Sequence, residues 1–137
     1  METKNQLPAS VQELIRDRIH SSEELEALLL VRTEPSRWWT DEDVAVALRT
    51  SRELARSGLS GLTRNALCVE SVPGRGPTRY EPSQPALASA VEQLAELYVE
   101  QRLEVLVFLS RSAISRVRVD ALRTFAEAFR ISGKKNG

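Results

Sequence analysis

The chain has 137 residues, the length of one domain, and it is 42% hydrophobic and 28% charged, which excludes wholesale disorder. Its 19 basic and 19 acidic side chains cancel, so no overall charge draws it to nucleic acid or to a membrane. The sequence has no apolar run of about eighteen residues, and residues 1–10 are polar. We therefore expect neither a membrane span nor a secretory signal, and we expect a cytoplasmic protein.

Helix starts are marked where a Ser or Thr is followed three residues later by Glu or Asp, because each side chain can accept a hydrogen bond from the other's backbone N–H. Apolar residues at helical spacing follow each of these pairs. The pairs are Ser10–Glu13, Ser21–Glu24, Thr40–Asp43 and Thr50–Glu53. They predict an N-terminal helix within residues 1–20 and three further helices, over Ser22–Thr33, Asp41–Arg49 and Ser51–Arg64.

The apolar spacing changes after the fourth predicted helix. The strand-like run Leu67–Val72, the turn Pro73–Pro77 and the returning run Thr78–Tyr80 predict a β-hairpin over Leu67–Tyr80. The expected fold class is therefore mainly α-helical with one small β-hairpin.

From Pro85 onward, apolar residues recur every three or four positions, which predicts a long helix with a heptad seam. One polar residue, Gln101, interrupts the seam, and we assign the apolar run Leu103–Leu109 to the same helix. A final amphipathic helix is predicted over Val119–Phe129. The expected organisation is a single domain with an N-terminal helix (1–20), a core (21–82), C-terminal helices (83–131) and a tail (132–137).

Charge is unevenly distributed along the chain. Residues 1–48 carry five basic and ten acidic side chains, whereas residues 49–80 carry six arginines and two glutamates. Arginine presents a planar fork of donors that suits phosphate and guanine. Only three of the 19 basic residues are lysine, so a general bias toward arginine explains the residue type. It does not explain why acids are scarce in residues 49–80.

Three helices, the second of them short, followed by a hairpin form the element order of a winged helix-turn-helix domain. The stretch Trp38–Ala45 and the triplet Glu53–Ala55 resemble helices two and three of that class of bacterial transcriptional regulator. With the additional N- and C-terminal helices, the chain is similar in outline to small dimeric regulators of the MarR-like kind. It departs from them after helix three, where Asn65 and Ala66 replace the usual glycine, and Asn65 is expected to take the left-handed conformation.

The resemblance implies a function in transcription regulation with double-stranded DNA as the partner, helix three lying in the major groove and the hairpin touching the backbone or minor groove. Helical geometry places four polar residues on an arc of about 80°, opposite the side that carries Leu54, Gly58 and Leu62, with Glu53 and Arg64 flanking the arc. The four are Arg52, Arg56, Ser60 and Thr63. The expected DNA-binding residues are Thr50, Ser51, Arg52, Arg56, Ser60, Thr63, Arg64, Arg75 and Arg79.

The long apolar seam after Ser83 is more than a winged-helix core can cover, and soluble monomers seldom leave such a patch exposed. We therefore expect a homodimer, which would also present two recognition helices to one duplex. The rival arrangement is a monomer in which the N-terminal helix, Val11 to Ile19, folds back over the same stripe. The expected dimer interface comprises Leu87, Val91, Leu94, Tyr98, Val105, Leu106, Phe108 and Leu109.

We expect neither an enzyme, nor a cofactor, nor a metal. His20 is the only histidine and Cys68 the only cysteine, which argues against a histidine-based triad and a zinc site. Cys68 is expected to pack half-buried in the first strand of the hairpin. Of Trp38 and Trp39, one is expected in the core and the other against the long C-terminal helix.

Winged helices also bind proteins, so the alternative function is a protein-interaction module that binds no DNA. The acidic residues at the start of helix two favour this alternative, although they also suit a helix N-terminus. One feature separates the two functions, because DNA binding requires a continuous basic face. That face would combine Arg52, Arg56, Arg75 and Arg79.

Overall fold

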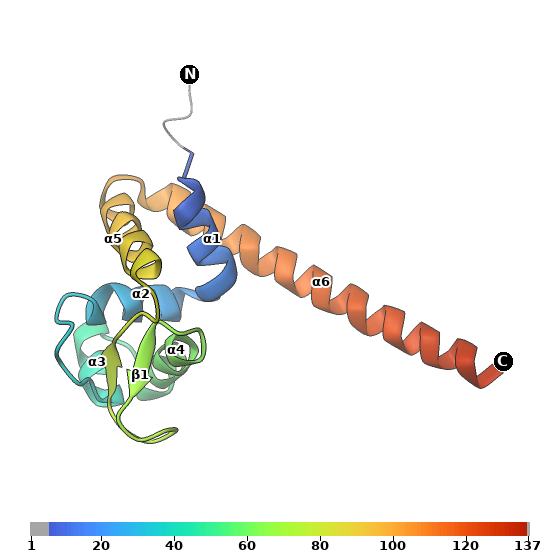
Figure 1. Ribbon diagram of the computed structural model, residues 1–137, viewed down its shortest axis with the longest axis horizontal. Helices are drawn as coiled ribbons and strands as arrows, with labels where there is room; N and C mark the ends of the chain where they lie inside the picture. Colours follow the sequence, from blue (N-terminus) through green and yellow to red (C-terminus); the bar gives the residue numbers. More distant parts are fainter. Residues whose placement is uncertain (1–5, 137) are drawn as a thin grey trace.

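The computed structural model describes the backbone of residues 6–136 and the side chains of residues 6–128. This part of the chain is mainly helical and has one small antiparallel sheet, as predicted (Figure 1). Among residues 6–136, no helix combines the length and the apolarity that crossing a membrane requires. The elements are α1 (Ala9–Arg18), α2 (Ser22–Val31), α3 (Asp41–Leu48), α4 (Arg52–Arg64), β1 (Cys68–Glu70), β2 (Thr78–Tyr80), α5 (Pro85–Glu100) and α6 (Arg102–Asn136).

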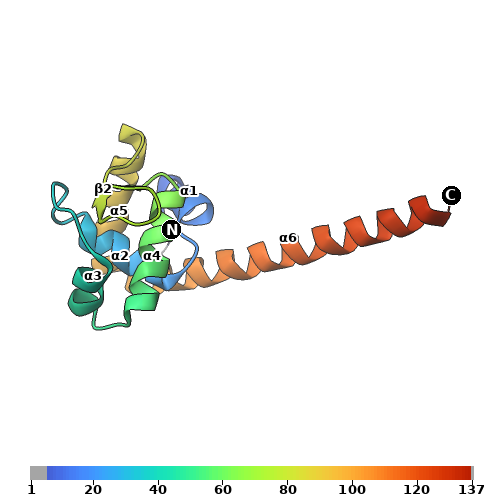
Figure 2. The same cartoon turned by 90° about the horizontal axis from the view of Figure 1, so that it is seen from below.

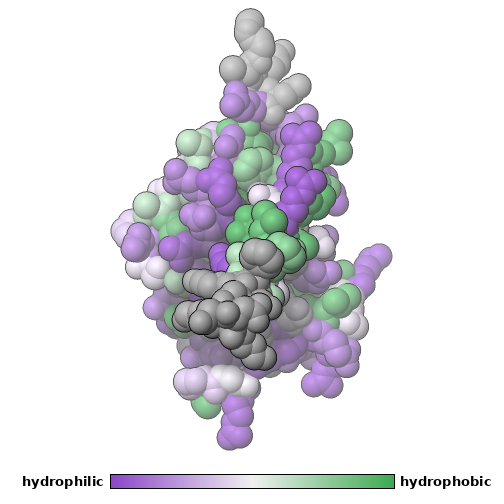
Figure 3. Space-filling view, turned by 90° about the vertical axis from the view of Figure 1, so that its right-hand side faces the viewer, coloured by the Kyte–Doolittle hydropathy of each residue, from purple (hydrophilic) through white to green (hydrophobic). Residues whose placement is uncertain are grey.

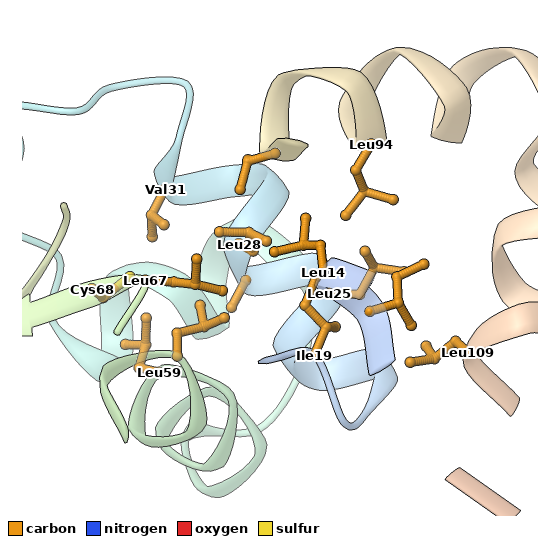
Figure 4. Close-up of a cluster of buried hydrophobic side chains, with 14 of the residues drawn as sticks. Leu14, Ile19, Leu25, Leu28, Val31, Leu59, Leu67, Cys68, Leu94 and Leu109 are labelled. Carbon is orange, nitrogen blue, oxygen red and sulfur yellow. The ribbon is translucent and has the colours of Figure 1, made fainter. Parts of the chain in front are cut away.

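One hydrophobic core joins elements from both ends of the chain. Leu28 of α2, Leu59 of α4 and Leu67 before β1 lie at one end of the cluster, and Leu94 of α5 and Leu109 of α6 lie at the other (Figure 4). All five side chains are buried. The middle of the chain, residues 21–82, and the terminal helices therefore share one core.

Helix α4 packs closely on α2 because two glycines face it. A Cβ atom at Gly58 would lie 2.7 Å from the backbone carbonyl oxygen of Glu23, and one at Gly61 would meet the carboxylate of the buried Glu24. Glycine lowers helix propensity by about 1 kcal/mol relative to alanine. Here it permits an approach between the two helix backbones that any side chain would block.

The hairpin is joined to the start of α3 by a buried tryptophan. Trp39 and Thr78 exchange two backbone hydrogen bonds, of 2.7 and 2.8 Å, which add a third short strand-like segment beside β2. Within the hairpin, Cys68 pairs with Tyr80 and Glu70 with Thr78. Trp39 thus fills the core, as one tryptophan was expected to do. Strand β1 is shorter than the predicted Leu67–Val72.

The helix starts agree with the predicted pairs only in part. Thr40 and Asp43 form a complete capping box, with both hydrogen bonds at 3.0 Å. Helix α4 is instead capped by Ser51, which accepts a hydrogen bond from the backbone N–H of Leu54, so Thr50 is not its cap. Helix α1 begins one residue before Ser10, whose hydroxyl donates to Gln93 of α5.

The corner after α4 differs from the prediction in which residue is left-handed. Ala66 has φ +68°, whereas Asn65 has φ −99° and ends the helix. The Asn65 side chain donates to the carbonyl of Arg18, and the Arg18 guanidinium donates to the carbonyl of Asn65. These two bonds fix Asn65 against the end of α1, and the next residue makes the turn.

The boundary between the two C-terminal helices also differs from the prediction. Helix α5 ends at Glu100, and Gln101 leaves helical geometry with φ −134° and ψ 54°. The run Leu103–Leu109 therefore opens α6 instead of continuing α5. Helix α6 continues through residues 119–129 and through 132–136, so the predicted tail is helical as far as Asn136. The side chain of Phe129 and the whole of Gly137 lie outside the described residues.

The predicted dimer seam is occupied within the single chain. Helix α1 folds back and contacts both α5 and α6. It covers Val91, Leu94, Val105 and Leu109, all of which belong to the core. These four side chains are buried within the single chain, so this structure leaves none of them exposed for the predicted dimer interface and matches the rival arrangement in which the N-terminal helix folds back. The other four residues of the predicted interface are only partly buried against the core: Leu87, Tyr98, Leu106 and Phe108.

Candidate nucleic-acid interface

Helix α4 is amphipathic, and its apolar side faces α2 and α3. Ala55, Leu59 and Leu62 are buried there. The sequence also predicts Leu54 on this side, but its side chain is 44% exposed. Leu54 lies in the first turn of α4, where the helix extends beyond the core.

Three of the four arginines that DNA binding requires line one hollow. It has a volume of about 370 Å³ and lies between the beginnings of α3 and α4 and the turn of the hairpin. Its three arginines are opposed by two carboxylates, so the surface is mixed in charge. The lining residues are Thr40, Asp41, Glu42, Arg52, Arg56, Arg75, Gly76 and Pro77.

Arg56 is held by groups of the protein itself. Its guanidinium donates to the carbonyl of Gly74 at 2.7 Å and lies 3.4 Å from the carboxylate of Glu70 and 3.7 Å from that of Asp41. Glu70 also accepts a hydrogen bond from the backbone N–H of Gly74 at 2.8 Å. Arg56 therefore ties the hairpin turn to α4 and α3, and its donors are directed inward.

Arg79 lies outside the hollow, on β2. It pairs with Glu81, and its guanidinium stacks over the ring of Trp38, 4.6 Å from the ring centroid. Trp38 was expected to cover the C-terminal helix; it instead lies beside the hairpin and is partly exposed. The four arginines therefore do not form one continuous face, and by the criterion set from the sequence this favours the protein-interaction module over DNA binding.

Some of the remaining predicted contact residues are exposed, and the others are half-buried or hydrogen-bonded within the protein. Arg52, Arg64 and Arg75 are exposed. The Thr63 hydroxyl donates to the carbonyl of Leu59, and its side chain faces a second hollow beneath the hairpin. Thr50 and Ser60 are half-buried, and the hydroxyl of Ser51 caps α4.

The outward side of α4 carries residues that were not predicted as contacts. Glu53 and Ser57 are exposed there, one turn apart. Part of the predicted contact side of α4 faces the hairpin, because the hairpin turn packs against that side of the helix. The sequence did contain a signal for this arrangement. Glu70 is one of the two acids among residues 49–80, and its carboxylate pairs with Arg56.

The acidic residues at the start of α3 stabilise the N-terminus of that helix. The pKa of Asp43 is below its ordinary value, chiefly because its carboxylate accepts the backbone N–H of Thr40. Asp41 and Glu42 occupy the same first turn, where the helix dipole favours negative charge. They stabilise α3 and, in the same position, reduce the positive charge of the hollow.

Cys68 is buried, and burial raises the pKa of its thiol to about 12, so the thiolate is not formed near neutral pH. Its packing is more complete than the half-buried position predicted for it. Within the described part of the chain, no cluster of three His, Cys, Asp or Glu side chains could hold a metal ion.

The geometry therefore offers a polar hollow with two exposed arginines, Arg52 on α4 and Arg75 on the hairpin turn, and Arg56 is hydrogen-bonded to that turn. Comparison of the chain with family models, with curated proteins and with solved structures finds no match in any of the three.

Proposed function

We propose that the protein is a DNA-binding regulator of the winged-helix type that contacts DNA through Arg52 of α4, its recognition helix, and Arg75 of the β1–β2 hairpin, its wing, and not through the four-arginine face expected from the sequence. One observation carries the proposal: Arg52 and Arg75, from different elements, line one hollow open to solvent. Arginines from a helix and from an adjacent turn can contact base edges and the neighbouring phosphate at the same time. The likeness in element order to small MarR-like regulators supports the same function.

The roles of the three arginines differ. Arg52 lies in the first turn of α4, where a recognition helix meets base edges. Arg75 lies at the tip of the wing and is suited to phosphate, which carries no sequence information. Arg56 acts as a positioning residue, since its bond to Gly74 fixes the turn that presents Arg75.

Binding of sheared genomic DNA, followed by fluorescence anisotropy across a salt series, tests the proposal. Wild-type affinity should fall linearly on a logarithmic scale as salt rises, because bound phosphates release counterions. Arg75→Ala should weaken binding to all sequences alike and lower the salt slope by about one, whereas Arg52→Ala should cost roughly 1–3 kcal/mol at a selected site. Arg111→Ala, the same change at an exposed position of α6, is the control.

Failure of the wild-type protein to bind any DNA at low salt would contradict the proposal.

The second candidate, a protein-interaction module that binds no DNA, is favoured by the separation of Arg79 from the other three arginines and by exposed aliphatic side chains on α3, α4 and the hairpin. These are Val46, Leu54 and Val72. Such side chains serve a protein interface better than a phosphate backbone.

A further inference from the structure

Three arginines line a hollow between the end of α1 and the middle of α6. Its volume is about 370 Å³, and none of the described residues that line it is acidic. Both cartoon views show α6 projecting away from the other helices, and the hollow lies toward the body end of this projection (Figures 1 and 2). The residues of this α1–α6 hollow are Arg16, Phe108, Arg111, Ser112, Ser115, Arg116 and Val119.

Helical spacing brings the α6 residues of the hollow to one side of that helix. At 100° per residue, the six positions from Phe108 to Val119 fall within an arc of about 140°. Arg16, in the last turn of α1, completes the hollow from the other helix. The site therefore exists only because α1 folds back and packs against α6.

Contacts within the protein hold two of the three guanidiniums in place. Arg116 donates to the carbonyls of Arg16 and His20 at 3.3 and 3.5 Å, which anchors it at the end of α1. The Arg16 guanidinium lies 6.0 Å from the centroid of the Phe108 ring. Arg111 is exposed. None of the three arginines forms an ion pair with a carboxylate of the described residues, so their charge is not neutralised there.

Beyond the hollow, the described arginines of α6 do not continue this positive surface along the helix. Arg118 lies about 160° away from Arg116 around the helix axis, and Arg123 pairs with Asp120. Three guanidiniums that converge on one small volume suit a compact ligand with more than one negative charge. A nucleic-acid backbone, which carries one charge per phosphate, is better matched by arginines spread along a track.

The donors of the hollow suit a phosphate monoester. Arginine pairs with carboxylate and phosphate alike, but a carboxylate offers two oxygens and one charge. A phosphate monoester offers three acceptor oxygens and a charge of about −1.5 to −2 at pH 7. Three guanidiniums, together with the hydroxyls of Ser112 and Ser115, can share those oxygens.

The hollow also has apolar surface, supplied by Phe108 and Val119. Phe108 is half-buried, and the side chain of Val119 is 48% exposed. Seen from the end toward which α6 points, hydrophobic side chains lie near the middle of the face with hydrophilic side chains around them (Figure 3). A ligand that fills the hollow therefore needs an apolar part beside its phosphate.

We propose that the α1–α6 hollow binds a small phosphate monoester with an apolar organic part. Arg16, Arg111 and Arg116 hold the phosphate, and the organic part lies against Phe108 and Val119. The site is separate from the hollow between α4 and the hairpin, and it does not depend on DNA binding. Because the ligand contacts both α1 and α6, its binding stabilises the folded chain.

Isothermal titration of the purified full chain with phenyl phosphate, at low ionic strength, tests the proposal. Binding should be saturable with one site per chain, and phenyl phosphate should raise the Tm. Benzoate keeps the ring but carries a carboxylate, and inorganic phosphate lacks the ring. Each should bind at least about tenfold more weakly than phenyl phosphate.

Variants of exposed residues locate the site. Arg111→Ala should weaken phenyl phosphate binding at least about tenfold, since it removes charged hydrogen bonds, and Ser115→Ala should weaken it less. Arg118→Ala makes the same change on the other side of α6 and should leave the affinity unchanged. Circular dichroism should show wild-type helicity for all three variants.

Three results would overturn the proposal: no saturable binding of phenyl phosphate at millimolar concentration, equal affinity for benzoate, or equal weakening by Arg111→Ala and Arg118→Ala. The last would assign the binding to overall charge. Fluorescence anisotropy with DNA separates this site from the proposed function, because Arg111→Ala should keep wild-type affinity for DNA. Loss of DNA affinity in Arg111→Ala would instead assign the hollow to a nucleic-acid backbone and would also overturn the proposal.

Discussion

Ala66 occupies a backbone conformation that is unfavourable for a residue with a side chain. Its φ of +68° places it in the left-handed region, at a cost of about 1–2 kcal/mol for a residue other than glycine. Ala66→Gly should therefore raise the free energy of unfolding by about 0.5–1 kcal/mol, because the greater freedom of glycine in the unfolded chain offsets part of the gain. Chemical denaturation measures the change.

The same substitution within a helix should have the opposite effect. Ala47 is exposed near the end of α3, where glycine costs about 1 kcal/mol relative to alanine. Ala47→Gly should lower the free energy of unfolding by that amount. Loss of stability in Ala66→Gly as well would mean that the methyl group of Ala66 contributes more than the backbone strain costs.

At the scale of elements, the contact between α2 and α4 depends on Gly58. Alanine would improve the helix propensity of α4 by about 1 kcal/mol, yet its Cβ would lie 2.7 Å from the carbonyl oxygen of Glu23, a backbone atom that cannot rotate away. We expect Gly58→Ala to lower the free energy of unfolding by about 1–3 kcal/mol, measured by urea denaturation. Ser57→Ala, at the exposed neighbouring position, should raise it by up to about 0.5 kcal/mol. A more stable Gly58→Ala variant would show that the two helices separate at little cost.

At the scale of the whole molecule, an ion pair links α2 to α5, and so the middle of the chain to its C-terminal helices. The guanidinium of Arg32 donates to both carboxylate oxygens of Glu92, at 2.8 and 3.0 Å. This hydrogen-bonded pair holds the pKa of Glu92 below its ordinary value of 4.5. A depressed carboxyl pKa contributes stability above the unfolded pKa, and the contribution is lost as pH falls through the folded pKa.

Glu92→Gln should therefore lower the free energy of unfolding at neutral pH by about 0.2–1 kcal/mol, the range for a partly exposed pair. Toward about pH 3 the difference from wild type should shrink, because Glu92 becomes protonated in both states. Denaturation at the two pH values measures this. Glu13→Gln, on the exposed side of α1, should show a smaller difference at neutral pH. A difference that stays constant with pH would mean that the pair contributes through packing.

Local sequence patterns predicted the helices up to α4 and the hairpin, but not the boundary between α5 and α6. All three helix starts predicted from capping pairs at Ser21 and beyond agree within a residue, because capping side chains and apolar spacing act over a few neighbouring positions. The turn Pro73–Pro77 likewise predicted the hairpin. The sequence predicted three arginines of the candidate site correctly, since Arg52, Arg56 and Arg75 do line one hollow. The separation of Arg79 from them was not predicted.

Tertiary structure alone decided which surfaces remain open. The heptad seam of the C-terminal half is a property of the sequence, but α1, distant in sequence, packs against it, whereas residues 117–128 of α6 are exposed. The sequence likewise determines that α4 carries arginines, but contacts with Glu70 and Gly74 of the hairpin determine that Arg56 faces inward. The physical reason is the same in both cases. Helix and turn formation depend on neighbours in sequence, whereas exposure and charge pairing depend on contacts between residues far apart along the chain.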